Sequence, residues 1–151
     1  MAPKRSVARC AEQRTWMVHN PAVTWETVRV RPAYNVLAPD GSEIRVLARA
    51  RGGSMVHCKL APGQVTRAVR HRTVEELWFC IAGRGQVWRQ SAETEETVDI
   101  ERGVSLNIPL GVAFQFRALG SEPLELVIVT MPPWPGEGEA VRIDGRWQAT
   151  A

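Results

Sequence analysis

The chain has few cysteines and no long apolar run. Its 151 residues include only three cysteines, Cys10, Cys58 and Cys80, which are widely separated and form no Cys-x-x-Cys pair. An odd and dispersed set argues against a disulfide framework or a structural zinc site, and is typical of reduced thiols in a cytoplasmic protein. No stretch approaches the roughly 18 consecutive apolar residues of a transmembrane helix, so we expect no membrane partner.

The chain also has no net charge outside its first twenty residues. The chain has 19 Lys and Arg residues against 16 Asp and Glu residues, a formal net charge of +3. Residues 1–20 carry this whole excess, and residues 21–151 are neutral. A neutral body argues against a phosphate-binding surface, so we expect no nucleic-acid partner. We expect residues 1–20 to form a basic, disordered leader, and Met17 leaves open whether residues 1–16 belong to the physiological protein.

A long amphipathic helical pattern is absent as well. Turn signals that contain Gly and Pro instead separate short runs rich in Val, Ile, Leu, Phe and Trp. Seven such runs are predicted strands: residues 44–50, 54–60, 76–81, 86–90, 104–108, 113–117 and 124–131. Short strands at nearly regular spacing predict an all-β sandwich or barrel. The Pro-rich residues 132–139 lack backbone donors, so we expect a strap there, followed by an edge segment over residues 141–147.

Residues 63–85 carry a pattern of Gly, His and Glu that resembles a known motif. It is similar to the first motif of the cupin family, Gly-x5-His-x-His-x3–4-Glu-x6-Gly. His71, Glu76 and Gly83 stand in register with the second His, the Glu and the last Gly of that motif.

Residues 103–114 resemble the second cupin motif, Gly-x5-Pro-x-Gly-x2-His. Gly103, Pro109 and Gly111 match at the required spacing. Together the two motifs extend the resemblance over about residues 40–131. The resemblance implies an all-β double-stranded β-helix, a jelly-roll-like barrel with a pocket inside one end. We therefore expect a loose N-terminal extension followed by a single cupin domain over 21–151, with 40–131 as its motif core and the Pro-rich strap near its C-terminal end.

The resemblance is incomplete at the positions that hold a metal. In metal-binding cupins three histidines and one glutamate ligate a divalent cation. Val69 stands at the position of the first His and Phe114 at that of the last, which leaves His71 and Glu76. Two ligands are fewer than a three- or four-ligand site requires, so we expect no cofactor. A divalent metal held by His71 and Glu76 in a reduced ligand set is the alternative.

The retained pair is the candidate for catalysis. If His71 and Glu76 point inward, as the resemblance implies, they form a His–carboxylate pair at an apolar pocket. The carboxylate favours the imidazolium and burial opposes it, so the pair could supply acid and base near neutral pH. In the alternative interpretation, the two side chains only hydrogen-bond each other and stiffen the barrel.

Side chains that flank this pair are candidates for binding a substrate. Alternation along predicted strands groups them on shared faces. The candidates are Val69, Trp78, Cys80, Trp88, Phe114 and Phe116. Ordinary core packing of a β-barrel is the alternative for the aromatic residues. An aromatic-lined pocket with few polar groups suits a small, largely apolar organic molecule.

These features favour a small-molecule-transforming enzyme of specialised metabolism, a metal-independent cyclase or isomerase. Two alternatives stay open: a metal-dependent dioxygenase or sugar-isomerase type of enzyme, and a non-catalytic ligand-binding protein. Edge strands and an external aromatic strap also favour a homodimer. The identity of the substrate and the type of reaction are left open by the sequence.

Overall fold

The structure, a computed structural model, describes residues 25–151, and this part of the chain contains strands and no helix. The predicted leader, with Cys10 and Met17, lies outside the described residues. The strands are β1 (Val36–Leu37), β2 (Glu43–Ala50), β3 (Gly53–Leu60), β4 (Val69–His71), β5 (Glu75–Ala82), β6 (Arg84–Gln90), β7 (Glu95–Glu101), β8 (Ser105–Ile108), β9 (Ala113–Leu119), β10 (Leu124–Met131) and β11 (Ala140–Arg142). Within these residues no helix is long and apolar enough to cross a bilayer.

All seven predicted strands are present, as β2, β3, β5, β6, β8, β9 and β10. Three strands, β1, β4 and β7, were not predicted. Strands β1 and β4 have only two or three residues, too few for a periodic pattern. Strand β7 has the sequence Glu-Glu-Thr-Val-Asp-Ile-Glu and lies at the edge of its sheet. Most of its residues are acidic, so its two inward-facing apolar residues do not form an apolar run that predicts a strand. The predicted edge segment over 141–147 is shorter in the structure, because regular pairing ends at Arg142.

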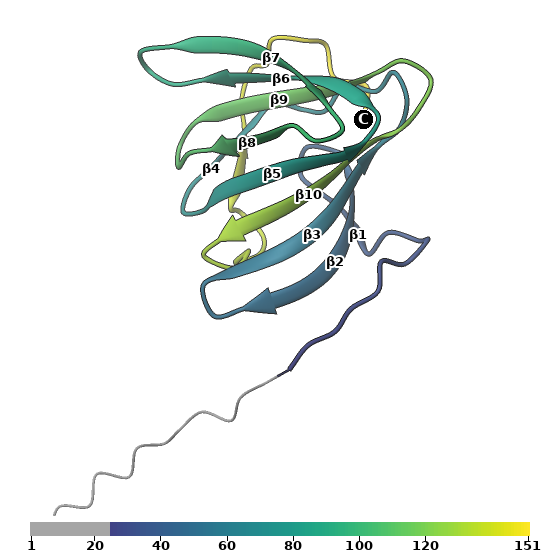
Figure 1. Cartoon of the computed structure of the whole chain (residues 1–151). Helices are drawn as coiled ribbons and strands as arrows, with labels where there is room; N and C mark the ends of the chain where they lie inside the picture. Colours follow the sequence, from purple (N-terminus) through teal and green to yellow (C-terminus); the bar gives the residue numbers. More distant parts are fainter. Residues whose placement is uncertain (1–24) are drawn as a thin grey trace, which may run out of the picture.

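Two antiparallel sheets face each other (Figure 1). The strand order is β1-β2-β3-β10-β5-β8 in the first, called sheet A below, and β11-β4-β9-β6-β7 in the second, called sheet B. This double-stranded β-helix confirms the fold predicted from the two motifs. The core between the sheets includes Trp78, Val87, Phe116, Leu126 and Ile108, all nearly inaccessible to water.

The motif glycine Gly83 shows why this position tolerates no side chain. Its φ of 76° lies in the left-handed region, and a Cβ there would collide with the backbone carbonyl of Pro123. Gly83 therefore allows β5 to turn directly into β6 against the start of β10. This tight turn fixes the register of β5, which carries Glu76 and Trp78.

The C-terminal segment covers the outer face of sheet B (yellow in Figure 1). Ile143 and Trp147 pack there on Ala68, Trp88 and Ala113. The side-chain amide of Gln115 donates to the Trp147 carbonyl at 2.9 Å and accepts from its N–H at 2.8 Å. A Cβ at Gly145 would lie 2.6 Å from Oε1 of Gln115, so only glycine allows this close approach.

Candidate functional site

A cavity of about 700 Å³ opens between the two sheets. Its walls are mostly apolar, although charged and polar side chains, among them Asp40, Arg49, Glu137 and Arg142, also line it. Sheet A contributes Ile44, Val56, Glu76, Trp78, Ile128 and Thr130, and sheet B contributes Val69, His71 and Phe114. Trp134 and Ala140, from the chain that follows β10, line it as well. A concave, largely apolar pocket with few polar groups is the usual form of a small-molecule site.

Strand alternation brings the retained pair into this cavity. Along β5, Glu76 and Trp78 are buried, whereas Glu75 and Leu77 face outward. On β4, Val69 and His71 face inward, and Val69 lies opposite Phe114 of β9. The inward orientation that the resemblance implied for His71 and Glu76 is therefore observed.

His71 is held between aromatic rings and makes no hydrogen bond to any residue of 25–151. Its ring meets those of Phe114 and Trp134 edge-on, with centroid distances of 5.1 Å and 5.2 Å. Its Nδ1 is buried without a partner and lies 3.8 Å from Oε1 of Glu76. Burial lowers the pKa of His71 to about 4, against the opposing effect of the Glu139 carboxylate. The imidazole is therefore neutral at neutral pH.

Glu76 is the counterpart of this neutral base. The carboxyl is 6% exposed, and its Oε2 accepts a hydrogen bond of 2.7 Å from Nε1 of Trp78. Burial raises the pKa of Glu76 to about 8, and the Trp78 hydrogen bond only partly offsets this effect. Glu76 is thus mainly a carboxylic acid at neutral pH, and its contact with His71 is one between neutral groups rather than an ion pair.

Two further buried acids near the site were missed by the sequence interpretation. Asp40 lines the cavity, where burial raises its pKa although the N–H and hydroxyl of Ser42 both donate to its Oδ1. Glu139 accepts hydrogen bonds from the N–H and hydroxyl of Thr73 and from the N–H of Val74. Asp40 lies outside the predicted strands and Glu139 lies in the predicted strap, so neither was a candidate for the site.

The predicted binding residues separate into three groups. Val69, Trp78 and Phe114 line the cavity beside the pair. Cys80 and Phe116 belong to the packed core and do not line it. The expectation for Trp88 is corrected, because its neighbour Val87 fills the inward position on β6. Trp88 therefore lies on the outer face of sheet B, beneath Trp147.

The donor set does not fit the metal site that the family implies. Within residues 25–151, no three His, Cys, Asp or Glu side chains gather as a cation site would require. Val69 and Phe114 offer carbon where two histidine ligands would stand, which leaves only His71 and Glu76. Three or four ligands are usual for such a site. We therefore derive no step through a metal.

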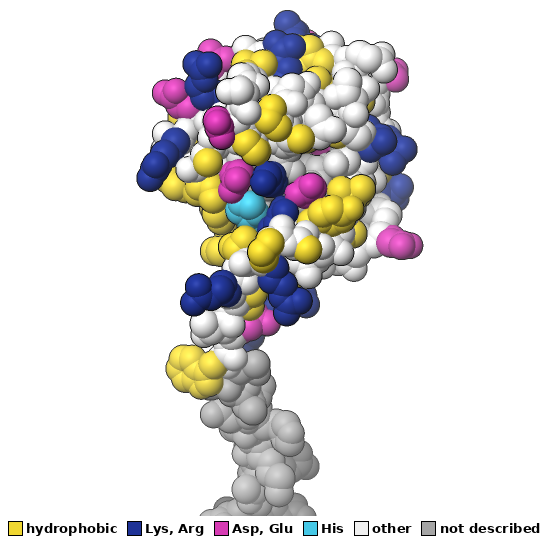
Figure 2. Space-filling model, turned by 90° about the vertical axis from the view of Figure 1, so that its right-hand side faces the viewer, with side chains coloured by type: hydrophobic (Ala, Val, Ile, Leu, Met, Phe, Trp, Pro, Cys, Tyr) yellow, Lys and Arg dark blue, Asp and Glu magenta, His cyan; other side chains and the backbone are white. Residues whose placement is uncertain are grey.

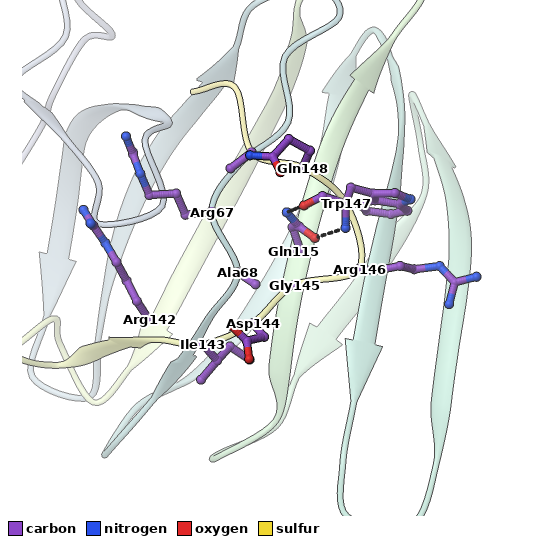
Figure 3. Close-up of a pocket in the computed structure, with 11 residues that line it drawn as sticks. Arg67, Ala68, Gln115, Arg142, Ile143, Asp144, Gly145, Arg146, Trp147 and Gln148 are labelled. Atoms are coloured by element: carbon purple, nitrogen blue, oxygen red, sulfur yellow. Dashed lines mark hydrogen bonds between the residues drawn. The ribbon is translucent and has the colours of Figure 1, made fainter.

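A second, more polar cleft of about 400 Å³ lies beneath the C-terminal segment (Figure 3). Arg67 and Arg142 lie side by side at its edge, and Gln115 lies at its centre. The amide of Gln115 is used in holding Trp147, as the dashed lines show. The central amide of this cleft thus serves to attach the segment, and the barrel cavity is the better candidate for chemistry.

Comparison with known proteins points to the cupin family, as the two sequence motifs do. A family model described as a cupin domain matches residues 56–130. A segment of 89 residues is 30% identical to the xanthan biosynthesis protein XanB of Xanthomonas campestris, covering 59% of this chain and 18% of that protein. The chain therefore spans less than a fifth of that relative.

Solved structures of low identity share the fold. A mutant of Bacillus subtilis oxalate decarboxylase OxdC superposes with a TM-score of 0.68 at 18% identity, over 80% of this chain and 33% of that one. KdgF from a Halomonas species superposes with a TM-score of 0.58 at 15% identity, over 68% of this chain and 87% of that one. The solved structures show the shared fold, and the family-model match over residues 56–130, together with the two motifs, identifies this chain as a small cupin.

Proposed function

We propose that the barrel cavity binds a small, largely apolar organic molecule with a carbonyl or hydroxyl group and moves a proton on it. The reaction class is a metal-independent isomerisation or cyclisation. One observation carries this proposal: His71 and Glu76 line the same cavity in neutral form, 3.8 Å apart. A neutral base beside a neutral acid is the arrangement that concerted acid–base catalysis needs.

The chemistry follows from the atoms that have no other partner. Among the described residues, neither Nε2 of His71 nor Oε1 of Glu76 makes a hydrogen bond. In the tautomer with its hydrogen on Nδ1, His71 can accept a proton from a carbon beside a substrate carbonyl at Nε2. Glu76 gives its proton to the carbonyl oxygen, and an enol results. Where the enol is conjugated to a second double bond, His71 returns its proton to a different carbon of the conjugated system and the enol hydroxyl returns its proton to Glu76. The double bond has then moved, the carbonyl forms again and both residues are restored.

The cavity walls support the same step. Proton transfer converts two neutral side chains into an imidazolium and a carboxylate, whose attraction is strong where water is excluded. Trp78, Phe114 and Trp134 surround this point with apolar surface, and Nε1 of Trp78 donates to the carboxylate as it forms. The pair thus gains its electrostatic stabilisation in the transition state rather than before it.

Deuterium exchange tests the proposal without a known substrate. The protein is incubated in deuterated water with a panel of apolar ketones that includes 2-tetralone, and mass spectrometry measures deuterium at the α-carbon. We expect exchange above the buffer rate, a loss of about 100-fold in His71→Gln, and no change in the outward-facing control Glu75→Gln. Binding of the ketones with exchange at the buffer rate would overturn catalysis and favour a ligand-binding protein.

A further inference from the structure

The mouth of the barrel cavity has an apolar side and a cationic side. Strands β1 and β11 are the end strands of sheets A and B, and residues of both line the cavity. Val36 and Leu37 of β1 are each 52% exposed, and Arg142 of β11 is exposed as well. Because these lining residues reach solvent, the cavity opens between the two strands. An incoming molecule therefore meets carbon on sheet A and a guanidinium on sheet B.

The register of β11 and β4 directs Arg142 towards the acid–base pair. Arg142 lies opposite Val69, so its side chain points to the same face of sheet B as Val69 and His71. Two residues of rise along β4 and one strand spacing across the sheet separate the Cα atoms of Arg142 and His71 by about 8 Å. Arg142 can thus contact one end of a small molecule whose other end meets His71 and Glu76.

Arg67 lies beside Arg142 in the cleft, and Figure 3 shows the two side chains extended next to each other. Among the described residues, neither guanidinium makes a hydrogen bond or an ion pair. The charge of Arg67 acts on Asp40, but burial opposes the charge of that carboxyl. Arg67 is half-buried and packs with Ala151 against Gly41. Arg142 is the exposed one, and an anion beside it would relieve the repulsion between the two guanidiniums.

The surrounding charges favour a singly charged anion. Residues 21–151 carry no net charge, and Figure 2 shows basic and acidic side chains interspersed over one face of the barrel. Attraction of an anion therefore depends on the local pair of arginines rather than on the field of the whole protein. Glu137 also lines the cavity, and its carboxylate repels a doubly charged phosphate more strongly than a carboxylate. The two oxygens of a carboxylate also match the planar guanidinium of arginine.

We propose that the substrate of the cavity is an amphipathic carboxylic acid, whose carboxylate binds Arg142, with Arg67 beside it, and whose apolar body enters the barrel. Val36 and Leu37 cover the apolar part nearest the mouth. The reacting carbonyl lies a few carbon atoms from the carboxylate, at the inner end of the molecule beside the acid–base pair. This substrate class belongs to the same cavity, so it rests on the function proposed for that cavity.

A matched pair of ketones tests the carboxylate site. Butyrophenone and 3-benzoylpropionate share a phenyl ketone and a carbon chain, and a carboxylate in the second replaces the terminal methyl group of the first. Isothermal titration calorimetry on the full chain measures the dissociation constant of each ketone. We expect 3-benzoylpropionate to bind about tenfold more tightly, and added KCl to reduce this difference. Equal affinity for the two ketones, or binding of neither, overturns the proposal.

Arg142→Gln and Arg70→Gln separate the site from a general effect of charge. Arg70 is exposed on the other face of β4, so Arg70→Gln removes the same charge outside the cavity. We expect Arg142→Gln to weaken the binding of 3-benzoylpropionate about tenfold and to leave that of butyrophenone unchanged. Arg70→Gln is expected to change neither. Equal losses in the two variants overturn the site, as does a loss of affinity for both ketones in Arg142→Gln.

Arg49, the other arginine that lines the cavity, lies opposite Ser54 where β2 meets β3. Arg49→Gln is expected to leave the binding of 3-benzoylpropionate unchanged, because no second arginine lines the cavity beside Ser54. Arg67→Gln is expected to weaken it by less than Arg142→Gln does. A loss in Arg49→Gln with none in Arg142→Gln overturns the assignment.

Binding and deuterium exchange together distinguish this site from the proposed chemistry. His71→Gln keeps both arginines, so we expect it to bind 3-benzoylpropionate within about twofold of the unchanged chain while exchange is lost. Binding that depends on Arg142, without exchange in the unchanged chain, supports the carboxylate site and overturns catalysis. Exchange that is as fast with butyrophenone as with 3-benzoylpropionate, at equal and subsaturating concentrations, supports catalysis and overturns the carboxylate site.

Discussion

Two buried glutamates near His71 differ in their charge, although both are almost inaccessible to water. Glu139 is 4% exposed and Glu76 is 6% exposed. Glu139 lies near the barrel surface, and its carboxylate accepts three hydrogen bonds from Thr73 and Val74. Burial acts to raise the pKa of Glu139, but these hydrogen bonds outweigh burial and lower it. Glu76 lies deeper. Among the described residues only Trp78 donates a hydrogen bond to its carboxyl, and the pKa of Glu76 is raised.

The comparison shows that exposure alone does not set the charge of a buried carboxyl. The number of donors and the depth of protein around the group decide between a fixed anion and a neutral acid. Glu139 serves as an anion that holds the turn between β4 and β5. Glu76 is left protonated at the cavity, where a proton can be used. Substitution of each glutamate by glutamine separates these two roles.

The largest effect is expected for Glu76→Gln in proton transfer. Glutamine keeps the size and an acceptor for Trp78 but cannot give up a proton, so exchange into apolar ketones falls by about 1,000-fold. Mass spectrometry of the α-carbon measures this loss. Glu139→Gln, which leaves the cavity acid in place, is expected to retain exchange wherever it is folded. Equal losses in both variants would contradict the division of roles.

Glu139→Gln is expected to have the larger effect on stability. The variant loses a charged acceptor for three hydrogen bonds, which costs about 3 kcal/mol of unfolding free energy. Urea denaturation at pH 7 measures this value. Glu76→Gln is expected to raise the unfolding free energy in the same experiment, because at pH 7 the unfolded chain is stabilised by ionisation of Glu76 and a glutamine cannot ionise. A reversed order of the two variants would show that Glu76 is the fixed anion.

The pH dependence of stability sharpens the comparison further. The raised pKa of Glu76 gives stability that is present below its unfolded value of 4.5 and lost as pH rises through about 8. The lowered pKa of His71 gives stability that is present above 6.5 and lost as pH falls through about 4. The two trends oppose each other between 4.5 and 6.5, so the loss becomes visible from about pH 6.5 to 8.

That loss amounts to about 2 kcal/mol for one proton over this range. Urea denaturation across the pH series measures it. Glu76→Gln is expected to remove the loss, and Glu139→Gln to retain it, because the pKa of Glu139 lies below this range. Persistence of the full loss in Glu76→Gln would assign it to another group.

The smallest effect on stability is expected for Trp78→Phe, which removes the hydrogen bond that the indole donates to Glu76. The pKa of Glu76 then rises further, because the hydrogen bond that lowers it is gone. Loss of this bond costs about 1 kcal/mol of stability. A carbon-13 titration of the Glu76 carboxyl follows the change. An unchanged titration would show that the indole does not act on Glu76.

Much of the fold could be predicted from local patterns. The predicted strand over 124–131 has the observed bounds of β10, because apolar residues continue until Pro132 ends the pairing. The resemblance to the cupin motifs implied that His71 and Glu76 point inward, and both are buried on their strands. Alternation then grouped Trp78 with Glu76 and Val69 with His71. Alternation could not say which side of β6 faces the core, so the location of Trp88 required the structure.

The pattern of short apolar runs in the sequence thus determined an all-β fold, and the motif spacing determined the resemblance that implied a cupin barrel, an inward-facing pair, and carbon side chains at two expected ligand positions. Only the tertiary structure decided the charges at that pair. Glu139 reaches the surroundings of His71 from 68 positions later in the chain, and Asp40 approaches Glu76 from 36 positions earlier. Burial and hydrogen bonding depend on such distant neighbours, so the sequence named the acid and the base, and the packing set their protonation.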